Sequence, residues 1–239
     1  MTPSLVAVAH GTRDPQGPDT VERLMAQVRR RLQGVPVHTS YVELNEPSFE
    51  QVMSERHEPT VVVPLLLSTG YHTNVDLPRM VELASGPVRI ARPLGPHPLL
   101  AALMCRRLLA SGARPGDAVV MVAAGSRDGD GLADSLAAGR LLQSHWGAPV
   151  RVAHLSGNGE RVVDVVDAHW HDGHRRIAAV PYLLAPGYFL RKARAQVTAA
   201  GCTSMADPLG SDRLVADLVV RRYSALAVTG TSSASSRVA

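Results

Sequence analysis

The sequence has few cysteines and few aromatic residues, and it has no long apolar run. Only two of its 239 residues are cysteines, Cys105 and Cys202, and they lie far apart. This excludes a disulfide framework and a CxxC-type zinc or iron–sulfur motif. Aromatic residues make up 4% of the chain, too few for a platform that stacks nucleic-acid bases. No apolar run approaches the roughly 20 residues of a transmembrane helix.

Lysine is also scarce. Lys192 is the only lysine, so arginine carries almost all the positive charge behind the formal net charge of +4. The arginines are scattered and form no separate basic arm, so we expect no nucleic-acid partner. A modest positive charge suits a polyanionic small molecule. The first residues lack a basic segment and a long apolar stretch, and we expect a soluble cytoplasmic protein without membrane contact.

The chain contains an internal repeat. Three pairs of segments correspond in the same order: residues 6–14 with 120–128, 64–72 with 181–189, and 93–95 with 208–210. This series predicts two copies of one fold, joined near residues 111–117, where Gly, Arg and Pro cluster. We therefore predict an N-terminal lobe at 1–113, a C-terminal lobe at 114–225, and a disordered tail at 226–239, which is dominated by Ala, Ser, Thr and Gly.

Short apolar runs alternate with longer helical patterns in each copy. The expected strands are residues 5–9, 37–42, 60–66 and 88–91 in the first copy and 118–123, 150–154, 175–180 and 203–206 in the second. Strands separated by helices are typical of βαβ units, and continuous apolar runs indicate parallel strands covered on both faces. The sequence thus predicts an α/β fold of two similar lobes, each a four-stranded parallel sheet flanked by helices.

Distinctive polar residues directly follow the strands of the first copy. His10 follows the first expected strand, Glu43 follows the second, and His72 ends the loop after the third. Ligands of parallel α/β sheets bind at the carboxyl ends of the strands, so we expect these side chains to lie together. Two imidazoles and one carboxylate form a metal-binding set suited to Fe²⁺, Co²⁺, Ni²⁺ or Zn²⁺ with open coordination positions. The same three residues are candidate catalytic bases.

The second copy lacks all three candidate ligands. The residues opposite His10, Glu43 and His72 are Ala124, Ser156 and Phe189, in that order. The surrounding loop sequences persist, so the fold needs the loops but not the histidines. This difference predicts one active site rather than two.

Other residues of these loops are candidates for binding a substrate. They are Gly11, Thr12, Arg13, Ser68, Gly70 and Tyr71 from the first copy and Gly125 and Ser126 from the second. Gly11 and Gly70 are expected to supply tight turns or close backbone approach. The Arg13-Asp14 pair recurs in the second copy, which favours structural roles. We expect Asp14 to cap the following helix and Arg13 to pair with it, with a substrate contact by Arg13 as the alternative. His97, between two prolines, is expected to cap a helix.

A second group of histidines comprises His169, His171 and His174. The group precedes an expected strand, so it lies at the opposite rim from His10. We interpret it as a polar helix end, with a metal-storage patch as the alternative.

Several of these motifs resemble those of the CbiX/SirB family of class II chelatases. They are the His10-Gly11-Thr12-Arg13 loop after an apolar strand, Glu43 with Pro47, and the segment from Pro64 to His72. The resemblance covers roughly residues 4–223 and is strongest in the first copy. The two-copy layout resembles that of the single-chain bacterial members.

This resemblance implies an enzyme that inserts Fe²⁺ or Co²⁺ into sirohydrochlorin, with the macrocycle between two lobes. No cofactor beyond the metal substrate is implied. The metal-handling histidines match His10 and His72, and the carboxylate matches Glu43. The chain lacks the His-rich run and the Cys-rich tail of some cobalt-associated members. This favours Fe²⁺, leading to sirohaem, over Co²⁺, leading to cobalamin.

Two other functions stay open on the sequence. A histidine phosphatase would carry Arg-His-Gly after its first strand, but here Ala9 precedes His10, so that arginine is missing. A carrier of metal or tetrapyrrole would bind the same ligands without turnover. No GxxxxGK[ST] or GxGxxG motif follows a strand, so no nucleotide is expected. One chain supplies both lobes, and we expect a monomer.

Overall fold

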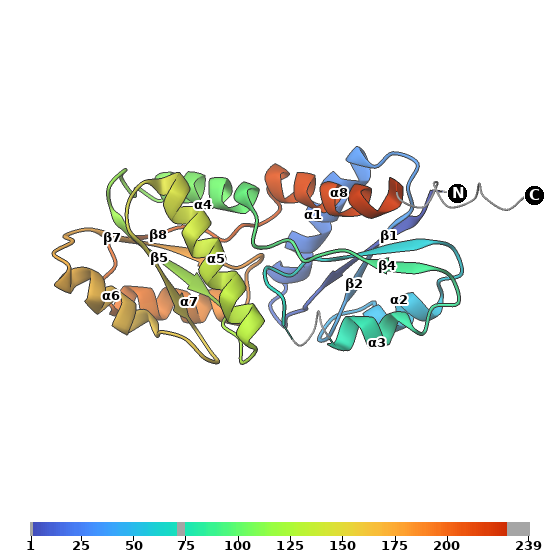
Figure 1. Ribbon diagram of the computed structural model, residues 1–239, viewed down its shortest axis with the longest axis horizontal. Helices are drawn as coiled ribbons and strands as arrows, with labels where there is room; N and C mark the ends of the chain where they lie inside the picture. Colours follow the sequence, from blue (N-terminus) through green and yellow to red (C-terminus); the bar gives the residue numbers. More distant parts are fainter. Residues whose placement is uncertain (1, 71–74, 229–239) are drawn as a thin grey trace, which may run out of the picture.

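The structure, a computed structural model, describes residues 2–70 and 75–228 and places each apolar run in one of two parallel sheets (Figure 1). The first sheet has the order β2-β1-β3-β4, with β1 (Ser4–Ala9), β2 (Val37–Tyr41), β3 (Thr60–Pro64) and β4 (Val88–Ile90). The second has the equivalent order β6-β5-β7-β8, with β5 (Ala118–Ala123), β6 (Val150–His154), β7 (Ile177–Tyr182) and β8 (Ser204–Met205). The predicted duplicated α/β fold is confirmed.

Helices cover both faces of each sheet, which is why the central strands β1, β3, β5 and β7 are buried throughout and mostly apolar. The helices are α1 (Gln16–Arg31), α2 (Phe49–Ser54), α3 (Leu77–Val81), α4 (Pro98–Ala110), α5 (Gly129–Trp146), α6 (Val162–His171), α7 (Tyr188–Ala199) and α8 (Arg213–Ala227). In α1 the buried positions include Val21, Leu24, Met25 and Val28, the spacing of one helix face. None of the helices in the described part of the chain is long and apolar enough to cross a membrane.

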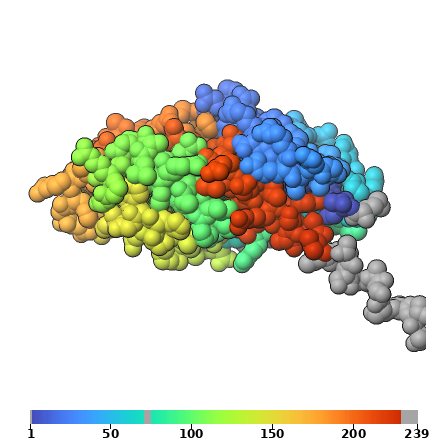
Figure 2. Space-filling view, turned by 90° about the horizontal axis from the view of Figure 1, so that it is seen from above, coloured from blue at the N-terminus to red at the C-terminus, as the bar shows by residue number. Residues whose placement is uncertain are grey.

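The two copies exchange their last helices. α4 packs against α5 and β7 of the second lobe, whereas α8 packs against α1 and β3 of the first. Figure 2 shows α8 (red) between α1 (blue) and α4 (green). The predicted division after residue 113 therefore separates the two sheets but not their helices. Leu94 and Leu209, from the repeated Pro-Leu-Gly segments that lead into these helices, are fully buried.

Helix α8 also extends into the predicted tail. It ends at Ala227, so residues 226 and 227 are helical rather than disordered. The hydroxyl of Tyr223 donates to the carbonyl of Pro3 at 2.6 Å, and Leu226 packs against the main core. These contacts with the first lobe keep the last turn of α8 helical. The polar composition of the segment alone did not reveal them.

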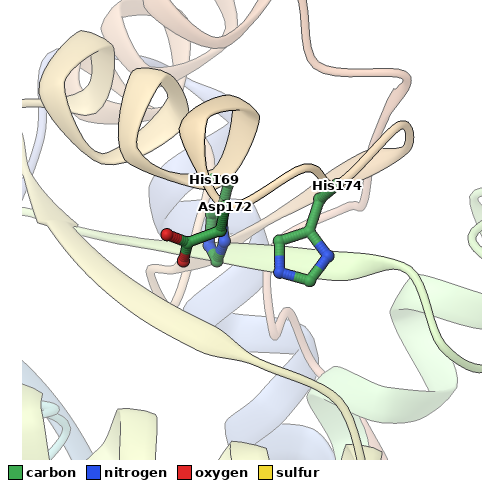
Figure 3. Close-up of side chains that lie close together, drawn as sticks. All are labelled: His169, Asp172 and His174. Atoms are coloured by element: carbon green, nitrogen blue, oxygen red, sulfur yellow. The ribbon is translucent and has the colours of Figure 1, made fainter.

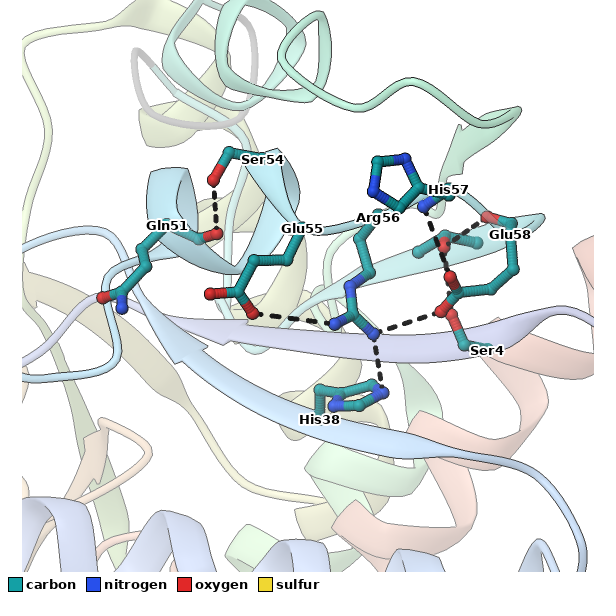
Figure 4. A network of polar contacts seen from close by, with 9 residues as sticks. Ser4, His38, Gln51, Ser54, Glu55, Arg56, His57 and Glu58 are labelled. Carbon is teal, nitrogen blue, oxygen red and sulfur yellow. Dashed lines mark hydrogen bonds and ion pairs between the residues drawn. The ribbon is translucent and has the colours of Figure 1, made fainter.

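A polar network at the amino ends of β2 and β3 keeps His38 neutral (Figure 4). Arg56 Nη1 donates to His38 Nε2 at 2.9 Å and to Glu58 Oε1 at 3.1 Å. Because a guanidinium group only donates, His38 Nε2 must be unprotonated. Burial, followed by the charge of Arg56, lowers the pKa of His38.

His97 caps α4, as the sequence predicts. Its Nδ1 accepts the backbone N–H of Leu99 at 3.1 Å, and Asp212 caps α8 in the same way. Burial, followed by the charges of Arg222 and Arg221, lowers the pKa of His97. Protonation of Nδ1 would remove the cap.

We expect the protein to lose stability as the pH falls through about 6.5, the ordinary pKa of histidine. The unfolded chain takes up protons there, whereas His38 and His97 resist protonation in the fold, so the free energy of unfolding falls with falling pH. Urea unfolding at about pH 7.5 and about pH 5.5 measures this loss. His97→Asn keeps a capping acceptor that does not titrate, so its loss should be smaller. A loss as large as that of the parent protein would contradict the role of His97.

Candidate functional site

A cleft of about 970 Å³ lies between the two lobes. One wall consists of the loops after β1, β2 and β3, and the other of the loops after β5 and β7 with the start of α7. Both walls therefore come from carboxyl ends of parallel strands, where α/β proteins bind ligands. The volume is at the upper end of that of small-molecule sites.

His10 and Glu43 meet at the mouth of this cleft. His10 Nδ1 lies 3.4 Å from Glu43 Oε1, and their side chains are 46% and 50% exposed. The expectation that the strand ends bring these two residues together is confirmed. His72 and Tyr71, the other predicted residues of the loop after β3, lie outside the described residues. The predicted residues Ser68 and Gly70 of that loop line the cleft.

Close backbone packing holds the His10 and Glu43 loops together. The backbone N–H of Glu43 donates to the carbonyl of His10 at 3.1 Å. Gly11 has a φ of +101°, and a Cβ there would lie 1.8 Å from the carbonyl oxygen of Glu43. Only glycine fits this position, both for its conformation and for the space.

The corresponding two loops of the second lobe pack together in the same way, but they lack the candidate metal ligands. Gly125 has a φ of +94°, and its Cβ would lie 1.8 Å from the carbonyl oxygen of Ser156. This confirms that Gly125 corresponds to Gly11 and Ser156 to Glu43. The Ser156 hydroxyl donates to the carbonyl of Ala124 at 2.7 Å, so it links the loop after β6 to the loop after β5. At these two corresponding positions, only the first lobe has an imidazole, that of His10, and a carboxylate, that of Glu43.

Leu44, which sequence reasoning did not single out, adopts a left-handed conformation beside Glu43. Its φ is +66°, and Gly157 at the corresponding position of the second lobe has a φ of +69°. This conformation costs a non-glycine residue about 1–2 kcal/mol. The Leu44 side chain is 52% exposed and lines the cleft. Backbone strain of this kind is typical of functional sites such as ligand-binding sites.

The second lobe also holds the loop after β3. Asp134 Oδ2 in α5 accepts the backbone N–H of Thr69 at 2.7 Å and its hydroxyl at 2.6 Å. The hydroxyl of Tyr182 donates to the carbonyl of Leu67 at 2.9 Å. Burial raises the pKa of Tyr182 well above its usual range, so this donor stays protonated. Nothing in the sequence marked Asp134, an acidic residue within a helix.

The expected pairing of Arg13 with Asp14 was wrong. Asp14 does accept a backbone N–H at the start of α1, that of Gln16 at 3.1 Å, and its ion-pair partner is Arg191 of the second lobe. The side chains of Arg13 and Arg127 are exposed, and both residues line the cleft, one from each lobe. The pairing fails because the helix start and Arg191 take up Asp14, which leaves Arg13 at the cleft.

The remaining predicted loop residues also line the cleft, and their polar atoms have local partners as well. These residues are Gly11, Thr12, Gly125 and Ser126. The hydroxyl of Thr12 accepts the N–H of Asp14 at 3.2 Å, and the hydroxyl of Ser126 accepts that of Asp128 at 3.0 Å. Each hydroxyl therefore stabilises the conformation of its own loop, whether or not it also binds a ligand.

Apolar side chains dominate the rest of the cleft. They include Leu44, Leu66, Leu184, Pro186, Tyr188 and Phe189. The rings of Tyr188 and Phe189 meet edge to face with centroids 5.5 Å apart, and Tyr188 is 61% exposed. Apolar walls, a His–Glu pair at one edge and an arginine from each lobe suit a large, flat ligand with acidic substituents.

The sequence profile of the CbiX family matches residues 4–111 and 118–226, once on each copy. The chain belongs to the CbiX family. Among curated relatives, a sirohydrochlorin cobaltochelatase of Priestia megaterium is 24% identical over 204 residues, which are 79% of this chain and 66% of the relative. One from Methanopyrus kandleri is 32% identical over 84 residues, 34% of this chain and 59% of the relative. The chain thus spans slightly less than two thirds of these relatives' lengths.

Solved structures support the CbiX fold over nearly the whole chain. SirB from Bacillus subtilis with Fe³⁺ gives a TM-score of 0.80 at 23% identity, covering 93% of this chain and 94% of that one. CbiX, described as the terminal enzyme for biosynthesis of siroheme in denitrifying bacteria, gives 0.71 at 19% identity, covering 93% and 99%. Both confirm the two-lobed chelatase-like architecture.

We expect Leu44→Gly to be more stable than Leu44→Ala by about 1 kcal/mol, the reverse of the usual order for these two residues. Glycine relieves the left-handed strain, whereas alanine retains it, and both remove the same half-exposed side chain. Urea unfolding of the two variants measures the difference. Equal stability, or a more stable alanine variant, would show that this position carries no backbone strain.

Proposed function

We propose that this CbiX-family protein inserts a divalent metal ion into sirohydrochlorin. The observation that carries the proposal is the separation of 3.4 Å between His10 Nδ1 and Glu43 Oε1. Two ligands each about 2.1 Å from one tetrahedral ion lie about 3.4 Å apart. The pair is therefore spaced to hold a metal at the mouth of the cleft with little movement. The names of the curated relatives support sirohydrochlorin as the macrocycle.

The pair has the chemistry that metal insertion requires. An imidazole and a carboxylate bind first-row divalent ions and leave coordination positions for macrocycle nitrogens. Insertion releases two protons from pyrrole nitrogens, and the same two groups accept protons as the metal leaves them. Both side chains are about half exposed, so these protons pass on to solvent. His72, outside the described residues, is the third ligand in this proposal.

The walls of the cleft bind the macrocycle. Its flat apolar faces lie against Leu44 and the Tyr188–Phe189 pair, and its acetate and propionate groups meet the guanidinium groups of Arg13 and Arg127. These arginines come from corresponding positions of the two lobes, so one chain binds acidic groups on both sides of the ring. A monomer is therefore sufficient for the reaction.

The metal substrate in this proposal is Fe²⁺, with Co²⁺ as the alternative. The preference for Fe²⁺ rests on the resemblance to family members that lack a His-rich run within the chain. The names of the curated relatives favour cobalt, and related SirB structures contain Fe³⁺ or cobalt. The His–Glu pair binds both ions, because such N/O sites discriminate weakly among first-row metals.

Two other functions are weaker. A histidine phosphatase needs a phosphate-binding arginine where this chain has the buried Ala9. A carrier of metal or tetrapyrrole would use the same cleft without turnover. An anaerobic assay that follows the absorbance of free sirohydrochlorin with Fe²⁺, Co²⁺ or Ni²⁺ separates the carrier from the enzyme. An enzyme consumes many equivalents of macrocycle, whereas a carrier stops at one.

In this assay we expect His10→Ala and Glu43→Gln each to reduce kcat by at least about 100-fold, because each removes a metal ligand and a proton acceptor. His145→Ala, an exposed histidine on α5, is the matched control and should retain the parent rate. Urea unfolding checks that all three variants are folded. Rates like the parent's in folded His10→Ala would end the proposal.

A further inference from the structure

A second group of possible metal ligands lies at the end of α6, on the rim of the second lobe opposite the cleft. One ligand atom from each of His169, Asp172 and His174 lies within 4.8 Å of the others. Figure 3 shows the three side chains gathered where α6 ends. The third histidine of this segment, His171, is exposed and not part of the group.

His169 lies at the polar helix end that the sequence predicted, in the last turn of α6. Its side chain is fully buried, and Nε2 lies 3.2 Å from the carbonyl of Val119 at the start of β5. A carbonyl only accepts, so Nε2 carries the proton and Nδ1 presents a lone pair. Nδ1 is buried and has no hydrogen-bond partner among the described residues. Buried polar atoms are almost always paired, so this nitrogen calls for a ligand.

The helix end itself brings the two imidazoles together. The N–H of His174 donates to the carbonyl of His169 at 3.2 Å, and the N–H of Gly173 to that of Trp170 at 3.0 Å. Gly173 has a φ of +84°. These bonds form a Schellman motif, in which the side chains at the positions of His169 and His174 touch. Their ring centroids are 5.5 Å apart. Apolar residues usually fill these positions, but here both are imidazoles.

Asp172 adds an oxygen ligand from the same turn. Its Oδ2 pairs with Arg151 at 2.9 Å, which leaves Oδ1 to bind an ion. Asp172 is exposed and His174 is half-buried, so two of the three ligands face solvent beside the buried imidazole of His169. The pair with Arg151 orients the carboxylate, as second partners of metal ligands commonly do.

We propose that His169, Asp172 and His174 form a binding site for a divalent transition-metal ion, for which Zn²⁺ is the probe. Two imidazoles and a carboxylate are a common set for Zn²⁺, with water completing the tetrahedron. Bound metal links the end of α6 to the turn before β7 and satisfies the lone nitrogen of His169. The site is separate from the cleft, and it stands whether or not the protein is a chelatase.

The test compares His174→Ala with His171→Ala, each combined with His10→Ala and Glu43→Gln to weaken binding in the cleft. Equilibrium dialysis against Zn²⁺, followed by metal analysis, gives the stoichiometry. We expect the His171→Ala protein to bind one more equivalent than the His174→Ala protein. Zn²⁺ should raise the Tm of the first protein and leave that of the second unchanged.

Asp172→Asn in the same background is a second variant, because an exposed side chain of equal size does not threaten folding. Its affinity for Zn²⁺ should fall at least about tenfold, in line with the loss of a charged ligand. Equal stoichiometry in the His171 and His174 variants, or unchanged affinity in Asp172→Asn, would overturn the site. The two imidazoles would then only pack against each other.

Discussion

The structure depends on the close approach of two loops at the carboxyl end of the first sheet. Gly11 lies so near the carbonyl of Glu43 that any side chain there would collide with it. This contact places His10 and Glu43, which are 33 positions apart in the sequence, at the separation of two ligands on one ion. The corresponding contact between Gly125 and Ser156 shows that it is a property of the fold rather than of metal binding.

The two copies of the fold contribute different parts of the candidate site. The first copy carries the imidazole and the carboxylate, whereas the second supplies the opposite wall and holds the loop after β3 through Asp134 and Tyr182. The exchange of α4 and α8 joins the lobes through a continuous apolar core. Both walls of the cleft are therefore parts of one packed structure, which favours a site of fixed geometry over two freely hinged halves.

The fold and part of the site could be predicted because they follow from local patterns. Buried parallel strands are apolar throughout, and ligands collect at their carboxyl ends, so His10 and Glu43 were expected together. The repeat also identified Ala124 and Ser156 as their counterparts without ligand function. The prediction for His72 falls on residues that the structure does not describe.

Features that depend on contacts between distant segments were not predictable. The helix exchange has no local signal, because α4 and α8 bury the same kind of apolar face in either lobe. Asp134 lies in no motif, and the left-handed backbone of Leu44 contradicts the preference of leucine. His169 was expected at a polar helix end, but packing against β5 buries it and leaves one nitrogen with no hydrogen-bond partner among the described residues.

The most direct measurement is the anomalous difference map of crystals of this protein soaked with Co²⁺. We expect a cobalt peak at the mouth of the cleft, about 2.1 Å from a ring nitrogen of His10 and from a carboxylate oxygen of Glu43. A cleft without cobalt, in crystals where the ion is bound elsewhere on the chain, would contradict it.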